Sequence, residues 1–376
     1  MGSASRVVDG VLLALGMTIF ASTAGAADRK VIILQALTGN GAFVGVPAAE
    51  AMKFAADELN AKGFLGADKL TYEVVDSAST RAQAMASITR YAADPNVLAI
   101  LGPTTAVEAI PGGAVATEGK VVMYAMTNAE ATLKSGPYSF FAAQPPRVTM
   151  PHIADYVLNV VKARNCAIVN LSDNEAYVEQ AKYFREYAEP RGLKIVDSTG
   201  VKGSDSDFSA VSTRIVGAKP DCVMLFTHAP VAANLAIQLK QAGLDARTRL
   251  IGQTGIASPQ LVSIGGASVE GVVFNADWSP GGNSPAGKAF VEAYRKATGK
   301  EADNWAALGY TYMNVLATAI KNASPNPTRD KVRDAMTRTK DVPVIVGGGK
   351  YSLNDRVPDY GVTFLQVRNG QFVAAQ

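Results

Sequence analysis

Short apolar runs alternate with longer amphipathic segments along most of this chain. The first run, Val31–Leu34, is apolar throughout, whereas the segment from Pro47 to Ala61 repeats its apolar residues every three or four positions. A short run that is apolar throughout is typical of a strand buried on both faces, and the longer repeat is typical of a helix. Strands and helices that alternate in this way predict a parallel sheet covered by helices on both faces.

The alternation occurs twice, which predicts two α/β units of similar size, each with its own core. The predicted strands of the first unit are 31–34, 70–76, 97–102, 121–125 and 138–143, and those of the second are 166–171, 194–199, 221–226, 249–253 and 271–276. One long helix, 150–164, is predicted between the two sets. Pro47 is expected in the first turn of its helix, where the missing N–H is harmless.

The last quarter of the chain does not predict a third unit. A Pro/Gly-rich stretch, DWSPGGNSPAG, leads to two further predicted helices, 286–299 and 304–323. The closing segment predicts a β-hairpin whose turn is RNGQ. We expect these elements to return to the first two units, so that the chain crosses between them several times.

The N-terminus has the features of a secretory signal peptide. Arg6 precedes the apolar stretch VLLALGMTIFA, and the small residues Ala24, Gly25 and Ala26 follow it. The apolar stretch is shorter than the roughly 20 residues that a membrane span needs. We predict that residues 1–27 are a signal peptide cleaved after Ala26 or Ala27, and that the mature protein is periplasmic.

Composition and charge narrow the function further. The net charge of +3 is spread over the chain without a cluster of lysine and arginine, which argues against a nucleic-acid partner. With two histidines and two cysteines, a zinc site is improbable. Cys166 and Cys222 open predicted strands that are neighbours in a doubly wound sheet. A disulfide between them is geometrically possible, but two buried free thiols are slightly favoured because a bridge between parallel neighbours would be strained.

The glycines after the first strand raise the question of a dinucleotide cofactor. Gly39, Gly41 and Gly45 are spaced G-x-G-x-x-x-G, which is close to the dinucleotide fingerprint. That fingerprint needs an acidic residue about 20 positions further on, and Asp76 lies well beyond that distance. The sequence contains no nucleophile elbow, no H-E-x-x-H and no phosphate-binding loop. We therefore expect neither an enzyme nor a cofactor.

Candidate ligand-binding residues follow the predicted strands, where open α/β sheets bind ligands. In the first unit, Phe43 and Val44 follow the first strand, Thr104 and Thr105 the third, and Thr127 the fourth, beside an exposed Ala125 carbonyl. Threonines at a helix N-terminus can form an anion site, although each alone could equally be an N-cap.

The second unit offers Tyr177, His228 and Thr254 in the corresponding loops. Packing or capping roles are equally open for Tyr177 and His228.

In order and spacing, several segments resemble the periplasmic binding proteins of ABC transporters related to the Leu/Ile/Val-binding protein. They are LTGNGAFVGVPAAEAMKFAADELNAKG, ILGPTTA, SDNEAYVEQ, DFSAVSTRIVGAKPDCVMLF and VEGVVFNADWSP. The resemblance implies two α/β lobes, joined by three crossings, that close on a ligand. It implies lobe 1 from residues 28–143 plus 277–357 and lobe 2 from residues 144–276 plus 358–376.

The same resemblance assigns roles to the candidates. Thr104 and Thr105 fall where the ligand carboxylate binds, and Thr127, with the Ala125 carbonyl, where the head group binds. Tyr177 would cover the ligand, while Phe43, Val44 and His228 fall at positions of its aromatic wall.

One position departs from the family pattern. Amino-acid binders place a carboxylate in the loop that here reads IGQTGIAS, and Thr254 occupies the expected position of that acid. An ammonium group buried without a countercharge is costly. The ligand is then an amino acid held differently, with Asp173 or another carboxylate as its countercharge, or a carboxylate without an ammonium, such as an aromatic acid.

These observations lead to a functional hypothesis. We expect a monomeric substrate-binding protein that captures a small carboxylate-bearing solute and delivers it to the permease and ATPase subunits of an ABC importer in the inner membrane. The alternatives are a ligand-sensing module on the same fold, and an amide or urea binder.

Overall fold

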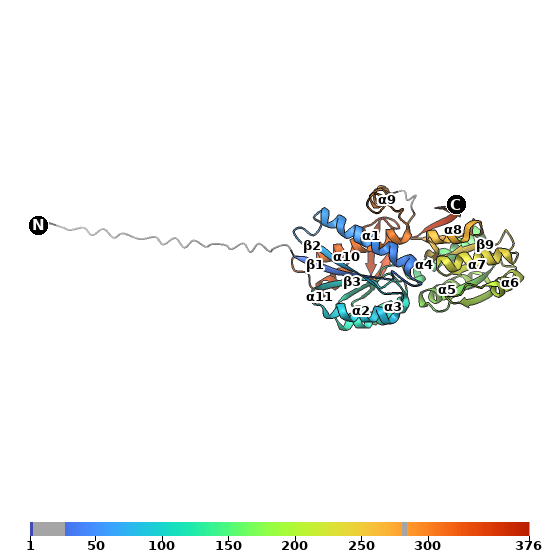
Figure 1. Cartoon of the computed structure of the whole chain (residues 1–376), viewed down its shortest axis with the longest axis horizontal. Coiled ribbons are helices and arrows are strands. Elements are labelled where there is room, and N and C mark those ends of the chain that lie inside the picture. Colours follow the sequence, from blue (N-terminus) through green and yellow to red (C-terminus); the bar gives the residue numbers. More distant parts are fainter. Residues whose placement is uncertain (3–26, 280–283, 376) are drawn as a thin grey trace.

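The computed structural model describes residues 1–2, 27–279 and 284–375. Residues 3–26, which hold most of the predicted signal peptide, lie outside this described part. Two α/β lobes lie side by side, as the repeated pattern predicts (Figure 1). No described helix is both long and apolar enough to cross a membrane.

The first lobe contains a five-stranded parallel sheet in the order β2-β1-β3-β4-β5. Its strands are β1 (Asp28–Gln35), β2 (Lys69–Asp76), β3 (Val97–Leu101), β4 (Val122–Ala125) and β5 (Ser139–Phe141). Along β1, Val31 and Ile33 pack under α1 (Ala42–Ala61) and α10 (Asn304–Asn322). Ile32 and Leu34 face α2 (Arg81–Ala93) and α3 (Ala106–Glu118) on the other side. Burial on both faces explains the unbroken apolar run.

The second lobe is built on a seven-stranded sheet in the order β15-β14-β10-β9-β8-β6-β7. Its strands are β6 (Asn165–Leu171), β7 (Lys194–Val201), β8 (Cys222–Phe226), β9 (Arg249–Gly252), β10 (Val273–Ala276), β14 (Thr363–Arg368) and β15 (Gln371–Ala374). One face carries α4 (Pro146–Asp155) and α5 (Glu175–Ala188), and the other carries α6 (Ser209–Ala218), α7 (Ala229–Gln241) and α8 (Pro259–Gly265). The predicted hairpin is confirmed, with Asn369 and Gly370 at positive φ between β14 and β15.

The segment after β10 returns to the first lobe before the final hairpin joins the second sheet. Helices α9 (Pro285–Thr298), α10 and α11 (Arg329–Thr337) pack on the first lobe, beside a small sheet of β11 (Val342–Pro343), β12 (Lys350–Asn354) and β13 (Val357–Asp359). The chain therefore crosses between the lobes after β5, after β10 and after β13. The residue boundaries proposed for the lobes stay predictions. The short helical turns are η1 (Glu130–Ser135), η2 (Tyr156–Val161), η3 (Glu189–Arg191), η4 (Thr254–Ile256) and η5 (Gly266–Val269).

Two helix predictions were wrong at their ends. Helix α1 begins at Ala42, so Pro47 lies in its second turn and leaves the Phe43 carbonyl without its usual donor. The helix starts early because Ser79 fixes the glycine turn, accepting from the Gly41 N–H and donating to the Thr38 carbonyl. The segment predicted as one helix over 150–164 begins at Pro146 and changes at Tyr156 into the π-helical turn η2.

The slight preference for free thiols was also wrong, because Cys166 and Cys222 form a disulfide. Strands β6 and β8 pair in a register that places the two residues directly opposite each other. Their Cα atoms are 4.6 Å apart, within the range that disulfides span. Register, which the sequence pattern does not specify, decided this pairing.

Arg329 joins helix ends that are far apart in the sequence. Its guanidinium donates to the carbonyls of Tyr91, Ala92, Asp94, Val97 and Gly119, at the ends of α2 and α3 and at the start of β3. The last carbonyls of a helix have no partner within it, and a cation there also interacts favourably with the helix dipole.

We expect Arg329→Met to lower the free energy of unfolding by about 2 kcal/mol, because these carbonyls would lose their donor. Arg338→Met is the matched control, since Arg338 is exposed at the end of the same helix. Urea denaturation of both variants measures the difference. Equal stability of the two would show that the Arg329 hydrogen bonds contribute nothing net.

Candidate functional site

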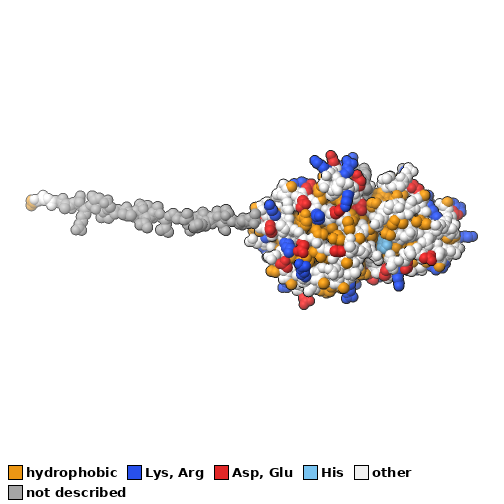
Figure 2. Space-filling model, in the orientation of Figure 1, with side chains coloured by type: hydrophobic (Ala, Val, Ile, Leu, Met, Phe, Trp, Pro, Cys, Tyr) orange, Lys and Arg blue, Asp and Glu red, His pale blue; other side chains and the backbone are white. Residues whose placement is uncertain are grey.

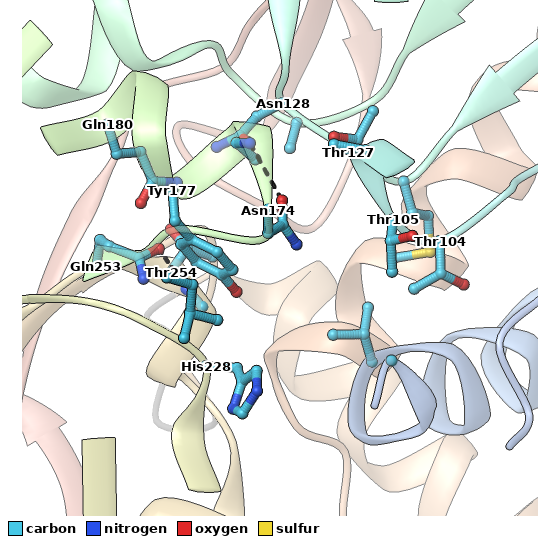
Figure 3. A pocket seen from close by; sticks show the side chains of 18 of the residues that line it. Thr104, Thr105, Thr127, Asn128, Asn174, Tyr177, Gln180, His228, Gln253 and Thr254 are labelled. Carbon is cyan, nitrogen blue, oxygen red and sulfur yellow. Dashed lines mark hydrogen bonds between the residues drawn. The ribbon is translucent and has the colours of Figure 1, made fainter. Parts of the chain in front are cut away.

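A cavity of about 280 Å³ lies between the lobes, at the carboxyl ends of the parallel strands. Figure 3 shows Thr104, Thr105 and Thr127 on one side and Tyr177, His228 and Thr254 on the other. Eight of the nine predicted residues line this cavity, namely Phe43, Val44, Thr104, Thr105, Thr127, Tyr177, His228 and Thr254. Strands of both sheets end at the cleft, which is why loops far apart in the sequence meet there.

Three long helices begin at the cavity. Thr105 caps α3, Asn174 caps α5 and His228 caps α7, and all three capping residues line the cavity. Helix N-termini carry unpaired N–H groups and partial positive charge, so this arrangement favours an anion. None of the described residues that line the cavity is a lysine or an arginine. A carboxylate here would be held by amides and hydroxyls rather than by a cationic side chain.

The hydroxyls of Thr104 and Thr105 are already used within the first lobe. The Thr104 hydroxyl donates to Gln35 Oε1 and accepts from the Ala36 N–H, each at 2.8 Å. Both the hydroxyl and the N–H of Thr105 donate to Glu108 Oε2, at 2.7 and 2.9 Å. Neither threonine therefore has a hydroxyl hydrogen to give to a ligand.

At this end of the cavity, the first turn of α3 is the part that can still bind a ligand. Ala106 and Val107 line the cavity, and their backbone N–H groups have no acceptor within the helix. Glu108, one residue further on, is buried, and burial raises the pKa of its carboxyl group. The anion-binding capacity of the loop thus resides in backbone amides.

Thr127 differs from the other two threonines. Its oxygen accepts from the Ala129 N–H at 3.2 Å, which leaves the hydroxyl hydrogen available to a ligand in the cavity. Ala125, in contrast, does not line the cavity. Its carbonyl is buried and accepts from the Ala142 N–H at 2.9 Å, continuing the pairing of β4 with β5. The expectation of an exposed Ala125 carbonyl was wrong because the ladder extends past the strand end.

Aromatic side chains close the cleft from both lobes. Phe43 comes from the first lobe, and its ring lies 5.5 Å from the ring of His228 in the second lobe, centroid to centroid. Trp305, at the start of α10, lies 6.2 Å from Phe43 and also lines the cavity. Trp305 was not predicted from the sequence, because only the return of α10 to the first lobe brings it there.

His228 combines a capping role with a place in the cavity wall. Its Nδ1 faces the Val231 N–H at 3.5 Å, and burial lowers the pKa of the ring. The ring is therefore neutral near pH 7, and its proton resides on Nε2. Nε2 is buried without a partner among the described residues.

The second-lobe wall is made of uncharged polar groups. The Thr254 hydroxyl accepts from Asn275 Nδ2 at 3.0 Å, which leaves its hydrogen available. Tyr177 lies near the start of α5, and burial raises the pKa of its phenol, which stays neutral. Gln180 lies one turn after Tyr177 and lines the same cavity. The helical spacing of Tyr177 and Gln180 was the signal that could have identified Gln180.

Two carboxylates also border the cavity. Asp277 is buried after β10 and accepts from the Tyr360 hydroxyl at 2.8 Å and from Asn304 Nδ2 at 3.3 Å. Burial raises the pKa of its carboxyl group. Asp173 is exposed and accepts from the Gly203 N–H at 3.0 Å. No cluster of three or more metal-ligating residues occurs in the described ranges.

The sequence from residue 30 to residue 371 matches a family model described as periplasmic binding protein. The chain belongs to this family.

Several proteins are similar in sequence to this periplasmic binding protein. A Leu/Ile/Val-binding protein of Rhizobium johnstonii is 28% identical over 97% of this chain and all of its own length. The leucine-specific-binding protein of Salmonella typhimurium is 26% identical over 82% of each chain. These relatives are solute-binding proteins and not enzymes.

Solved structures share the fold. A leucine-binding protein of Thermotoga maritima superimposes with a TM-score of 0.84 at 23% identity, over 92% of this chain and 97% of its own. The substrate-binding protein LivJ of a Streptococcus pneumoniae branched-chain amino acid transporter, solved with isoleucine, also gives 0.84 at 23% identity, over 94% and 99%. The predicted two-lobe fold is thereby confirmed.

Proposed function

We propose that this periplasmic binding protein is the exported substrate-binding component of an ABC importer and captures a small carboxylate-bearing solute by lobe closure. The observation that carries the proposal is the cavity between the lobes, into which α3, α5 and α7 direct their N-termini. The similarity to Leu/Ile/Val-binding proteins supports a transport role.

Lobe closure is supported by contacts that cross the cleft. Ala106 and Ala129 of the first lobe share an apolar cluster with Ala176 of the second. The Glu130 N–H donates to Glu179 Oε2 of α5 at 3.1 Å. A ligand shifts the equilibrium toward such a closed state only if it binds that state more tightly than the open one. A solute that contacts both walls does so, since an open cleft offers it one wall only.

The membrane partners of the proposed importer are its permease and ATPase subunits, and the protein would act as a monomer in the periplasm. Basic and acidic side chains are interspersed over the visible face of both lobes (Figure 2). The closed shape would be the feature that the permease recognises.

Isothermal titration with small carboxylic acids and with their uncharged amides tests the proposal. We expect micromolar or tighter binding of at least one acid and at least tenfold weaker binding when its carboxylate becomes an amide. The amide cannot use the partial positive charge of the helix N-termini. Absence of binding by every acid would contradict the proposal.

We expect Thr127→Val to weaken binding of that acid about tenfold, because a hydrogen bond to a charged group is lost. Thr213→Val is the matched control, since Thr213 lies on α6 and its hydroxyl donates to the Ser209 carbonyl, outside the cavity. An unchanged dissociation constant for Thr127→Val would remove Thr127 from the binding site.

A further inference from the structure

The second-lobe wall of the cleft contains two buried side-chain amides whose oxygens accept no hydrogen bond from the described residues. Gln180 is 3% exposed and Asn275 is 2% exposed, and both line the cavity. Gln180 Oε1 and Asn275 Oδ1 have no hydrogen-bond partner among the described residues. Leaving such a group unpaired costs about 1–3 kcal/mol, so the cost is expected to be recovered elsewhere.

Two uncharged hydroxyl groups lie on the same wall as these amides. Asn275 donates to Thr254, whose own hydrogen is available, and the Tyr177 hydroxyl lies on the same side of the cavity (Figure 3). This wall can therefore both donate and accept hydrogen bonds. A carboxamide or a hydroxyl on a ligand matches it, because each of these groups has a donor and an acceptor.

An ammonium group fits this wall less well. It offers donors only and needs a countercharge when it is buried. Of the two carboxylates at the cavity, Asp277 already accepts two hydrogen bonds from Tyr360 and Asn304. Asp173 is exposed to solvent and is bonded to the Gly203 N–H.

We propose that Gln180, Asn275 and Thr254 select a ligand that carries an uncharged hydrogen-bonding group, a hydroxyl or a carboxamide, besides its carboxylate. The inference rests on the proposed function, since the carboxylate end is the one assigned to α3. The preferred substrate class is then hydroxy acids or acid amides, and the amino acid of the same carbon skeleton is disfavoured.

Calorimetric titration with matched ligands tests the selection in the unmodified protein. Each set has one carbon skeleton and compares the 2-hydroxy acid, a monocarboxamide of the dicarboxylic acid, the 2-amino acid and the unsubstituted acid. We expect the tightest hydroxy acid or amide to bind at least tenfold more strongly than the amino acid of its skeleton. If an amino acid binds most tightly, this inference is overturned and the proposed function stands. If no member binds, the proposed function itself fails.

Gln180→Met separates a ligand contact from a structural role. We expect it to weaken binding of the best hydroxy acid or amide at least tenfold and to leave binding of the unsubstituted acid within twofold. We also expect the unfolding midpoint of the ligand-free protein to rise by about 2 °C, because an unpaired buried amide oxygen is removed. Gln241→Met, on the exposed end of α7, is the matched control. A fall in the midpoint, with binding of all ligands reduced equally, would show that Gln180 is structural and overturn its role.

We expect Thr254→Glu to reverse the ligand preference. A carboxylate beside Asn275 should improve binding of the amino acid and weaken that of the hydroxy acid, reversing their order. Unchanged order in a folded variant would show that this wall does not set the selection.

Discussion

Reduction of the Cys166–Cys222 disulfide should lower the free energy of unfolding by about 4 kcal/mol. The two residues are 56 positions apart, and closing a loop of that length in the unfolded chain removes an entropy worth about 4 kcal/mol. The bridge is buried beneath α4 and α5, in the apolar cluster that includes Ile168 and Met224, so solvent reaches it only when the lobe opens. Denaturant titration with and without dithiothreitol measures the difference.

Reduction is the more direct comparison because it breaks the S–S bond without removing any side chain. The double variant Cys166→Ala/Cys222→Ala also removes the two sulfur atoms from the core. The further decrease in its free energy of unfolding, relative to the reduced protein, measures this loss of packing. Thiol titration of the denatured, unreduced protein should find no free thiol. Two free thiols per chain would show that the bridge is absent, and the stability difference would then be near zero.

Gly309→Ala should lower the free energy of unfolding by about 3 kcal/mol, although alanine is the better helix former. Gly309 lies in α10 where this helix crosses α1. A Cβ at this position would lie 2.8 Å from the Ala48 Cα and 2.9 Å from its carbonyl carbon. Carbon atoms prefer a separation of about 3.5 Å or more, so α1 and α10 would have to separate by roughly 0.7 Å.

Gly217→Ala is the matched control for this substitution. Gly217 also lies in a helix, α6, but a Cβ there would meet no atom within 4 Å. Its replacement should raise the free energy of unfolding by about 0.5 kcal/mol, because glycine loses more backbone entropy on folding. Urea denaturation of both variants measures the change in the free energy of unfolding that each substitution causes. A stabilising effect of Gly309→Ala would mean that the two helices are not in close main-chain contact.

The expectation that ligand-binding residues follow the parallel strands located much of the cavity wall from sequence. Thr127, Tyr177 and Thr254 were found because parallel strands end at one edge of a sheet, and each of these residues follows a strand. Gln180 did not meet this expectation because it lies a turn inside α5, and Trp305 did not meet it because it follows no strand. Both positions depend on how a helix is oriented and packed.

The sequence by itself determined the class of fold and the edge of each sheet at which the candidate site lies. Those properties follow from local periodicity: Val31 to Leu34 are apolar without a break because helices cover both faces of β1. The tertiary structure alone decided which polar groups are available. Gln35 and Ala36 occupy the hydroxyl of Thr104, while the side-chain oxygens of Gln180 and Asn275 stay unpaired among the described residues. Hydrogen bonds between residues distant in the chain require register and packing, which no local pattern encodes.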